Sequence, residues 1–411
     1  MWPAHPPPRL SFKRDNVRIG VDACCWSNRR RFGRFTRELV THMISECGQH
    51  EFVLVVDRPT AEQCQFPAGA KLDVVDTRQQ PTEAASAEGS RSPMDLWRMA
   101  RRASRCPVDV FFFPAVYSFY PLFRRIPTAV TFHDAIAENH PDLIFPGLRS
   151  RLFWNLKTKL ALRQADCLLT VSQSARSQFA AAFKYPEAAI HVINEGPGDE
   201  FRPIHDQSVI HDVLDRYQLP RDVPLILYVG GISPHKNLHG LLHAATRLRQ
   251  QSQGPWHLVL VGDYKNDSFY GCFEELSQLS RQLELDSRVT FTGFVPNDHL
   301  VALYNAATML VLPSFSEGFG LPVVEAMARG VPVAASRRGS LPEVLGEAGL
   351  LFDPEDHGDM ARAIACLLED RALNEKLRSQ GQRRAELFSW KTAARDTIRL
   401  FEDMVNGTKR T

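Results

Sequence analysis

Short apolar runs rich in β-branched and aromatic residues alternate with longer amphipathic segments along most of the chain. In the first half the longer segments include Thr36–Cys47 and Leu148–Ala165, whose apolar spacing predicts helices. Such an alternation is typical of a parallel β-sheet that is covered by helices on both faces. The runs that we expect to form strands in this half are Val17–Val21, Phe52–Val56, Val108–Phe113, Thr128–Phe132, Cys167–Val171 and Ile190–Ile193.

The alternation stops at Asn194–Pro203, a stretch rich in glycine, proline and charge that we interpret as a linker. It resumes after a short predicted helix at Val209–Tyr217. The two halves share no sequence period, so we expect two domains of one architecture rather than a repeat, with the boundary near residue 198. The runs expected to form strands in the second half are Pro224–Val229, Trp256–Val261, Val289–Thr292, Met309–Pro313, Val331–Ala335 and Gly349–Phe352.

The pattern therefore predicts an α/β protein with two Rossmann-like, doubly wound parallel-sheet domains. Ligands of such sheets bind outside the carboxyl ends of the strands. Two of these domains facing one another form a deep central cleft. We therefore expect the functional residues to stand directly after strands.

Length and composition agree with this architecture and exclude some partners. The chain has 411 residues, which suits two domains of about 150–200 residues each. A formal net charge of +2 gives no reason to expect nucleic acid as a partner. The eight cysteines lack the spacing of metal ligands, so we expect free buried thiols.

We find no predicted secretion signal or membrane span in the sequence. Residues 1–15 are rich in proline and lack an apolar core, which predicts a disordered leader. The nearest candidate span, Val110–Phe123, is too short and is interrupted by Pro114 and Pro121. A buried strand followed by a loop is the better interpretation of that run, and we expect a cytoplasmic protein.

The first chemical motif is Val311–Pro332, which reads VLPSFSEGFGLPVVEAMARGVP. A strand ends near Pro313, a loop follows, and a helix starts near Leu321, where proline in the first turn is tolerated. Backbone amides at a glycine-flanked helix start suit an anion or sugar hydroxyls. Glu317 stands before this helix and Glu325 on its second turn, so both carboxylates can reach one extended ligand.

The second motif is Leu227–Leu238, which reads LYVGGISPHKNL. Gly230 and Gly231 follow a predicted strand, and Lys236 stands near the start of the next helix. Glycine lets the backbone approach a phosphate closely, and lysine supplies a compact positive charge. Alone, this pattern is common among proteins of many kinds.

Together the two motifs resemble the signature of the retaining GT-B glycosyltransferases of family 4, in which seven residues separate two glutamates. The segment EGFGLPVVEAMARGVPV carries most of the resemblance, which extends over residues ~17–390. The resemblance implies a GT-B fold with an acceptor-side domain at residues 16–197 and a donor domain at 198–385. It also implies that the last segment, 386–411, forms a helix that crosses back to the first domain.

The resemblance implies roles for single residues in binding a nucleotide-sugar donor. Glu317 contacts hydroxyls of the donor sugar, Glu325 grips the ribose, and Lys236 neutralises the diphosphate. Many relatives have arginine directly after the first glycine, where this chain has glycine, so the second cation stays open between His235 and Arg34. The other donor-binding residues implied are Gly230, Gly231, Gly318, Phe319, Gly320 and Leu321, with Phe294 and Val295 beside the base.

Two further candidates lie in the first half. Gly33 and Arg34 precede a predicted helix and match a family glycine loop that closes over the donor phosphates. His133, followed by Asp134, stands at the carboxyl end of a predicted strand. A lone histidine is more often structural, but many relatives carry a functional His–Asp pair at this point. The catalytic residues that the resemblance implies are His133, Lys236 and Glu317.

The sequence contains no D-x-D motif, and magnesium needs hard oxygen ligands of that kind. We therefore predict that no metal and no other cofactor takes part. Lys236 and the amides at the helix start would instead stabilise the leaving diphosphate. The resemblance implies retention of the anomeric configuration, with the acceptor attacking the face from which the diphosphate departs.

Other functions are possible on the same architecture. A phosphorylase and a nucleotide-sugar epimerase stay open, although no feature favours either. A non-catalytic sugar- or nucleotide-binding module is disfavoured because Glu317, Glu325, Lys236 and His133 are all present. A dinucleotide oxidoreductase and a P-loop NTPase are disfavoured because neither glycine-rich fingerprint occurs.

The motifs look most like those of bacterial enzymes that build O-antigen or exopolysaccharide, many of which use GDP-mannose. We therefore expect a mannosyltransferase with a GDP- or UDP-sugar donor and a glycan or polyprenyl-linked acceptor at the inner membrane face. Peripheral membrane association stays open at this point. The basic residues Arg98, Arg101, Arg102 and Arg105 fit either a membrane surface or, more simply, a solvated helix face.

Overall fold

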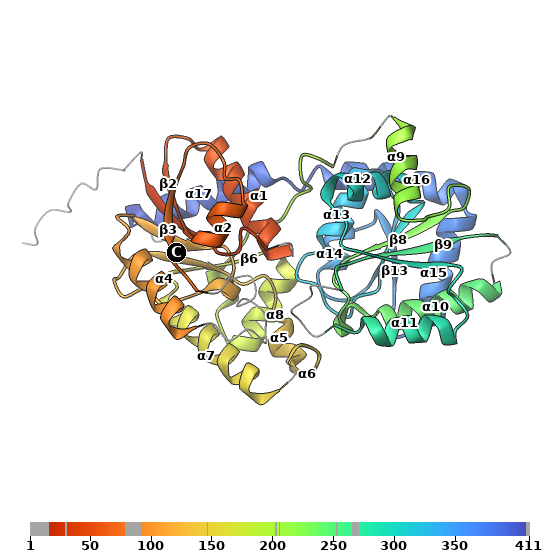
Figure 1. Ribbon diagram of the computed structural model, residues 1–411, viewed down its shortest axis with the longest axis horizontal. Helices are drawn as coiled ribbons and strands as arrows, with labels where there is room; N and C mark the ends of the chain where they lie inside the picture. Colours follow the sequence, from red (N-terminus) through yellow and green to blue (C-terminus); the bar gives the residue numbers. More distant parts are fainter. Residues whose placement is uncertain are drawn as a thin grey trace, which may run out of the picture.

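The computed structural model describes residues 16–28, 31–78, 92–145, 147–201, 204, 206–251, 254–264 and 271–407. The leader predicted at residues 1–15 lies outside these ranges. The described residues form two parallel β-sheets, one of seven strands and one of six, each packed with helices (Figure 1). The predicted fold class, a pair of Rossmann-like parallel-sheet domains, is confirmed.

The first sheet has the strand order β3-β2-β1-β4-β5-β6-β7. Strands β4, β5 and β6 are buried at every residue, as expected for parallel strands with helices on both faces. Chain order reverses between β1 and β4, and ligands of such sheets bind at this switch point. The elements are β1 (Arg18–Asp22), α1 (Arg31–Glu46), β2 (Glu51–Asp57), α2 (Arg58–Gln63), β3 (Ala70–Val75), α4 (Pro93–Arg105), β4 (Val110–Phe113), η1 (Val116–Ser118), β5 (Thr128–Thr131), α5 (Ile136–Asn139), α6 (Pro141–Ile144), α7 (Leu148–Gln164), β6 (Cys167–Thr170), α8 (Gln173–Phe183), η2 (Glu187–Ala189) and β7 (Ile190–Val192).

The second sheet has the order β10-β9-β8-β11-β12-β13, so its switch point lies between β8 and β11. None of the helices in the described ranges is both long and apolar enough to cross a membrane. The elements are α9 (Gln207–Arg216), β8 (Leu225–Val229), η3 (Pro234–Lys236), α10 (Leu238–Gln251), β9 (His257–Val261), α11 (Phe273–Gln282), β10 (Val289–Gly293), α12 (Asn297–Ala306), β11 (Met309–Leu312), α13 (Leu321–Ala328), β12 (Val333–Ser336), α14 (Leu341–Leu345), β13 (Gly349–Phe352), α15 (His357–Glu369), α16 (Arg371–Ala385) and α17 (Trp390–Asn406).

The last helix, α17, lies in the first domain and packs along α1 (Figure 1). The ring of Phe401 lies 5.2 Å from that of Phe112 in β4, measured between centroids, and Trp390 lies 5.7 Å from Phe35 in α1. Aromatic contacts of this kind bury large apolar areas. We propose that the chain divides near residue 198 and that its end, from residue 386, ties the second domain back to the first.

One local expectation is wrong, and one strand was missed. The helix predicted from Thr36 begins at Arg31, so Gly33 lies in the first turn of α1 rather than in a loop before it. A Cβ atom at position 33 would lie 2.1 Å from the carbonyl oxygen of Asn28, so the helix start packs directly on the preceding turn. The edge strand β3 was not predicted, because five of its six residues are exposed or only partly buried and it lacks a continuous apolar run.

A partly buried carboxylate joins α5 to α7 in the first domain. The indole N–H of Trp154 donates a hydrogen bond to Oε1 of Glu138, at 2.6 Å. Burial raises the pKa of Glu138 to about 7, and the hydrogen bond from Trp154 offsets only part of that rise. The folded protein therefore keeps a proton on Glu138 that the unfolded chain loses near its ordinary pKa of 4.5.

This proton makes stability depend on pH in a stated direction. Because the folded pKa is the higher one, the contribution of Glu138 to stability is present at low pH and is lost as pH rises through about 7. Glu138→Gln keeps an acceptor for Trp154 without a charge, so at pH 8 we expect unfolding to cost roughly 1–2 kcal/mol more than in the native protein. Urea denaturation at pH 5 and pH 8 measures this difference.

At pH 5 the two proteins should have nearly equal stability. The exposed Glu369→Gln serves as a control and should show no pH-dependent difference. A stability difference for Glu138→Gln that is the same at both pH values would contradict the assignment.

Candidate functional site

The centre of the candidate site lies at the carboxyl ends of β8 and β11. Lys236 ends η3 after β8, and Glu317 lies in the loop after β11. The Lys236 ammonium donates to Oε1 of Glu317 at 2.6 Å, and the hydroxyl of Ser314 donates to the same oxygen at 2.8 Å. The Glu317 carboxylate is buried, and this pairing stabilises its negative charge. The pair lies between β8 and β11, where the strand order of the sheet reverses.

The loop that carries Glu317 is held by its own backbone and by Ser340. The Ser340 hydroxyl donates to the carbonyl oxygens of Phe319, at 2.7 Å, and Glu317, at 3.1 Å. Gly320 has φ of +96° and stands directly before Leu321, the first residue of α13. A residue with a side chain would be strained at this φ, so glycine sets the sharp entry into the helix.

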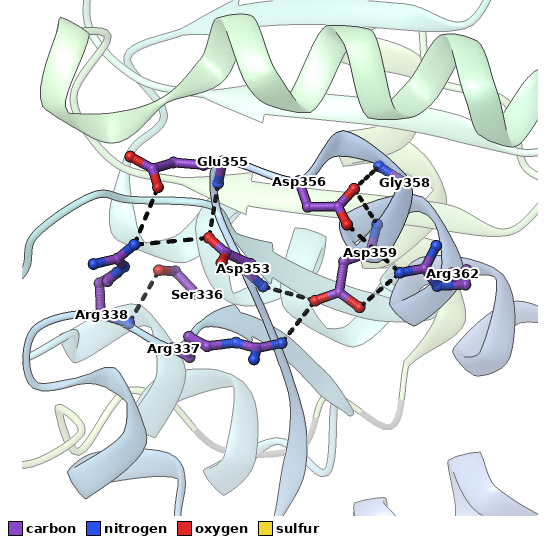
Figure 2. Close-up of polar contacts among 9 residues, drawn as sticks. All are labelled: Ser336, Arg337, Arg338, Asp353, Glu355, Asp356, Gly358, Asp359 and Arg362. Atoms are coloured by element: carbon purple, nitrogen blue, oxygen red, sulfur yellow. Dashed lines mark hydrogen bonds and ion pairs between the residues drawn. The ribbon is translucent and has the colours of Figure 1, made fainter.

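Ion pairs at the neighbouring strand ends tie the loop after β12, which carries Ser340, to α15 and to the turn that precedes α15 (Figure 2). Arg337 pairs with Asp359 at 2.7 Å, and Arg338 pairs with Glu355 at 3.2 Å. The backbone N–H of Asp353, after β13, donates to Asp359 at 2.8 Å, and this bond lowers the pKa of Asp359. These contacts hold the loop after β12 in place, and through Ser340 they support the backbone of Glu317.

The second glutamate, Glu325, lies on α13 and is buried in the seam between the two domains. It forms an ion pair with Arg34 of α1, and its Oε2 accepts a hydrogen bond from the Tyr304 hydroxyl at 2.9 Å. Burial raises the pKa of Glu325, and the Arg34 guanidinium offsets part of that rise. Burial also raises the pKa of Tyr304, which keeps its hydroxyl protonated as a donor.

Arg34 is enclosed by groups from the linker as well as by Glu325. Its guanidinium lies 4.7 Å from the centroid of the Phe201 ring and 3.7 Å from a carboxylate oxygen of Glu200. Burial alone would lower the pKa of Arg34, but the surrounding carboxylates, Glu325 first, outweigh it and raise that pKa. Arg34 therefore stays charged while joining three parts of the chain.

A further set of contacts, which we call the α8 clasp, joins the domains beside the Glu317 loop. The hydroxyl of Ser172 donates to the carbonyl oxygen of Gly318 at 2.6 Å. The backbone N–H groups of Gln173 and Ser174 donate to the two carboxylate oxygens of Glu343, each at 2.8 Å. An anionic carboxylate at a helix start is favourable, because the first N–H groups of a helix have no partner within it.

The structure reveals a role for Glu343 that the sequence did not predict. Neither Glu343 nor Ser172 is among the site residues predicted from the sequence. A serine directly after a strand and before a helical pattern is the usual sign of a helix N-cap, and Ser172 caps α8 in this way. That signal could have pointed to the end of α8, but not to the domain that covers it.

His133 follows β5 as predicted and is buried, with an exposed fraction of only 2%. Its Nε2 lies 2.9 Å from the carbonyl oxygen of Pro114, which can only accept, so that nitrogen carries the hydrogen. Its Nδ1 lies 3.8 Å from a carboxylate oxygen of Glu195, which is fully buried. These contacts neither involve nor exclude a ligand, and the catalytic role of His133 stays a prediction.

The remaining predicted residues line the edges of this region. Gly230 and Gly231 directly follow β8, and the Tyr228 hydroxyl donates to the carbonyl oxygen of Gly231 at 2.7 Å. Phe294 is partly exposed after β10, whereas the side chain of Val295 is buried in the core. Val295 can therefore offer a ligand only its backbone.

Among the residues that the structure describes, no group of three or more His, Cys, Asp or Glu side chains is arranged to hold a metal ion. The cations beside the two glutamates are instead Lys236 and Arg34. The site thus combines two buried carboxylates, each with one basic partner, at the start of α13. Such carboxylates can accept hydrogen bonds from neighbouring hydroxyls of a ligand, and the basic groups can meet its negative charge.

Comparison with known proteins gives two family matches that together cover most of the chain. The profile "Glycosyl transferases group 1" matches residues 212–384, and "Glycosyltransferase Family 4" matches residues 32–196. The chain is 34% identical over 287 residues to O-antigen chain mannosyltransferase B of Escherichia coli, a match that covers 69% of this chain and 72% of that protein. It is 32% identical over 287 residues to the serotype-specific mannosyltransferase WbdA of the same species, covering 69% of this chain but only 34% of that longer protein.

Solved structures agree on the fold. The structure of sucrose-phosphate synthase from Thermosynechococcus elongatus superimposes with a TM-score of 0.72, covering 96% of this chain and all of that one. The two sequences are 20% identical, so the likeness speaks for the shared architecture of two facing domains.

The α8 clasp makes a testable prediction about domain closure. Glu343→Ala removes the acceptor of two backbone N–H groups, which should weaken the contact between domains by about 1–3 kcal/mol. We expect the radius of gyration in small-angle X-ray scattering to increase. Distances between spin labels on the two domains should broaden in the same variant.

The exposed Glu347→Ala, two residues beyond α14, is the matched control and should leave both measurements unchanged. Equal scattering curves for Glu343→Ala and the native protein would show that the clasp does not hold the domains together.

Proposed function

The chain belongs to the glycosyltransferases of group 1 and family 4, and we propose that it transfers mannose from a nucleotide-diphosphate sugar, GDP-mannose first, to a glycan or lipid-linked glycan. The family is one of hexosyltransferases. Retention of the anomeric configuration is part of the proposal.

The observation that supports the proposal most directly is the pair of buried carboxylates on one loop and helix. Glu317 and Glu325 lie before and within α13, and each is paired with a basic side chain. A nucleotide sugar is an extended ligand with hydroxyl groups at both ends and negative charge in the middle. Glu317 suits the hydroxyls of the sugar and Glu325 those of the ribose, with Lys236 facing the diphosphate between them.

The proposed reaction needs charge to be met where it develops. The bond between the anomeric carbon and the β-phosphate oxygen breaks, and the nucleoside diphosphate leaves with the electron pair. The acceptor hydroxyl bonds to the same face of the sugar and passes its proton to the departing phosphate oxygen. Lys236 and the backbone amides at the start of α13 stabilise that oxygen without a metal ion.

A second basic group is expected to neutralise the diphosphate together with Lys236. Gly231 stands where many relatives have arginine, and His235 and Arg34 were the two candidates. Arg34 is buried and charged beside Glu325, which supports it over His235. Donor binding would then draw Arg34 partly from Glu325 toward the diphosphate, while Glu325 turns to the ribose.

The sugar and the acceptor are inferred from relatives. Two of them are mannosyltransferases, and one of these is described as acting on an O-antigen chain. This supports mannose as the sugar and a growing polysaccharide as the acceptor. We propose the cytoplasmic side of the membrane as the place where donor and acceptor meet.

A donor panel on the purified protein tests the proposal. With EDTA present, one nucleotide sugar among the GDP, UDP and ADP series should raise the melting temperature and be slowly hydrolysed or transferred. Glu317→Gln keeps the shape of the side chain but loses its charge, and we expect kcat/KM to fall about 10- to 100-fold. Lys236→Met should lower kcat about 100-fold or more, because the leaving group loses its cation.

The exposed Glu369→Gln is the control for both variants and should keep full activity. If no nucleotide sugar stabilises the protein, or if activity needs an added divalent cation, the proposal is wrong in its substrate or in its mechanism respectively.

A further inference from the structure

The helix α7 presents an unusual number of large apolar side chains to solvent. Leu148 is 84% exposed, Leu152 72% and Leu156 56%, and Leu160 follows one turn later with Phe153 beside this row. The leucines stand four residues apart, so they form one stripe along the whole helix. Exposed apolar patches of this kind on a soluble domain commonly mark a surface that another body covers.

The opposite face of α7 is buried against the core of the first domain. Trp154, Thr158 and Ala161 are buried there, and the Lys157 ammonium reaches the carbonyl oxygen of Tyr117 at 3.1 Å. The helix therefore already has its core-facing side. The leucine stripe is a second apolar face, and within the part of the chain that the structure describes it stays exposed.

Basic side chains are interleaved with the leucines, and the helix contains no acidic residue. Arg149, Arg151, Lys159 and Arg163 are all exposed. At 100° per residue, three of these four basic positions fall on the same side as the stripe. A face of leucine with lysine and arginine suits an anionic lipid surface, because leucine enters the acyl region while the long basic side chains reach the phosphates.

The same charge pattern argues against a second copy of this chain. A symmetric dimer through α7 would place the stripe against its own image. The basic residues of one helix would then face those of the other, with no carboxylate on either helix to pair with them. An anionic bilayer offers the complementary charge that a second copy lacks.

The basic and apolar character continues past the end of α7. Gln164, its last residue, exchanges two hydrogen bonds with the backbone of Leu122, at 2.9 and 3.2 Å. The three residues that follow Leu122 in the chain, Phe123, Arg124 and Arg125, are all exposed. The covered surface would thus extend from the stripe to this loop.

The helix α4 carries the arginines that the sequence analysis left open as a membrane-facing surface. It fits a membrane less well than α7. Arg98 pairs with Asp95 at 3.5 Å, and Arg102 pairs with Asp73. Arg101 lies against the ring of Trp97, 5.0 Å from its centroid. Since acidic partners already meet two of the α4 arginines, the interpretation as a solvated helix face is favoured there.

The start of α7 lies next to the candidate site. The short helix α6 precedes it (Figure 1), and α6 contacts η3, the segment that ends at Lys236. The helix α7 then runs 17 residues, about 25 Å, away from the seam. A surface that covers α7 therefore reaches the edge of the site where the two domains meet.

We propose that the leucine stripe of α7 docks the protein on an anionic lipid bilayer, with the helix lying in the interface and the interdomain seam facing along the membrane. This arrangement would present a lipid-linked acceptor to the site. Only this last point rests on the proposed function, since docking itself needs no donor and no catalysis.

Flotation with lipid vesicles tests the docking directly. The native full-length protein should float with vesicles of phosphatidylglycerol and phosphatidylethanolamine, and much less with phosphatidylcholine alone. The double variant Leu152→Ser/Leu156→Ser should lower vesicle affinity about tenfold or more, because two exposed leucines no longer enter the bilayer. Arg149→Glu/Lys159→Glu should lower affinity for the anionic vesicles about tenfold or more as well.

The matched control is Leu387→Ser, which changes an equally exposed leucine after α16 (68% exposed) and should leave flotation unchanged. All variants should keep the native melting temperature and the native affinity for the nucleotide sugar, since the changed side chains face solvent. If the native protein binds no nucleotide sugar, the proposed function is contradicted. The docking proposal is unaffected by that result, because flotation does not need a donor.

Three results would overturn docking. The native protein could fail to float with anionic vesicles, or the leucine variants could float as well as Leu387→Ser. Sedimentation could instead show a native dimer that the leucine variants dissociate, which would make the stripe an interface between copies.

Discussion

The ion pair between Arg34 and Glu325 is the contact on which the meeting of the two domains depends. A buried carboxylate is costly unless it is paired, and the cation that pairs with Glu325 among the described residues, Arg34, lies in the other domain. Two neighbouring features of the structure support the pair. Gly33 lets the start of α1 pack closely on the preceding turn, and Tyr304 supplies the second hydrogen bond that Glu325 requires.

The same arrangement, a buried or partly buried carboxylate held by hydrogen-bond donors, recurs around the site. Lys236 donates a hydrogen bond to Glu317 within the second domain. Glu343 of the second domain accepts hydrogen bonds from the first N–H groups of α8, which belongs to the first domain. The α8 clasp also includes the hydrogen bond from Ser172 to the carbonyl oxygen of Gly318, so the contact between the domains also positions the loop that carries Glu317. A donor that engages Glu317 therefore acts on a loop whose position already depends on both domains.

The fold was largely predictable because parallel strands are buried on both faces and leave continuous apolar runs. β4 and β5 are examples, and both were predicted close to their observed limits. β3 escaped prediction because an edge strand is half exposed and its apolar pattern is broken. The start of α1 was misplaced because the glycine at position 33 serves close packing, which looks the same in sequence as a loop.

The candidate site was predictable only where its residues are neighbours in sequence. Glu317 and Glu325 lie on one loop and the helix that follows it, so their spacing in the sequence was enough to predict that both could reach one ligand. The partner of Glu325, by contrast, lies on α1, and the partners of Glu343 lie about 170 residues away on α8. Glu195 beside His133 was likewise missed, since nothing local distinguishes a linker glutamate from a buried one. Pairings between domains depend on how the domains face each other, which no pattern within either domain reveals.

A crystal structure of the protein with its tightest-binding donor nucleotide, grown without divalent metal, tests the proposed site most directly. We expect the ribose hydroxyls to contact Glu325, the diphosphate to contact Lys236, and Arg34 to have moved toward the phosphate. A nucleotide bound away from α13, with the Arg34–Glu325 and Lys236–Glu317 pairs unchanged, would contradict it.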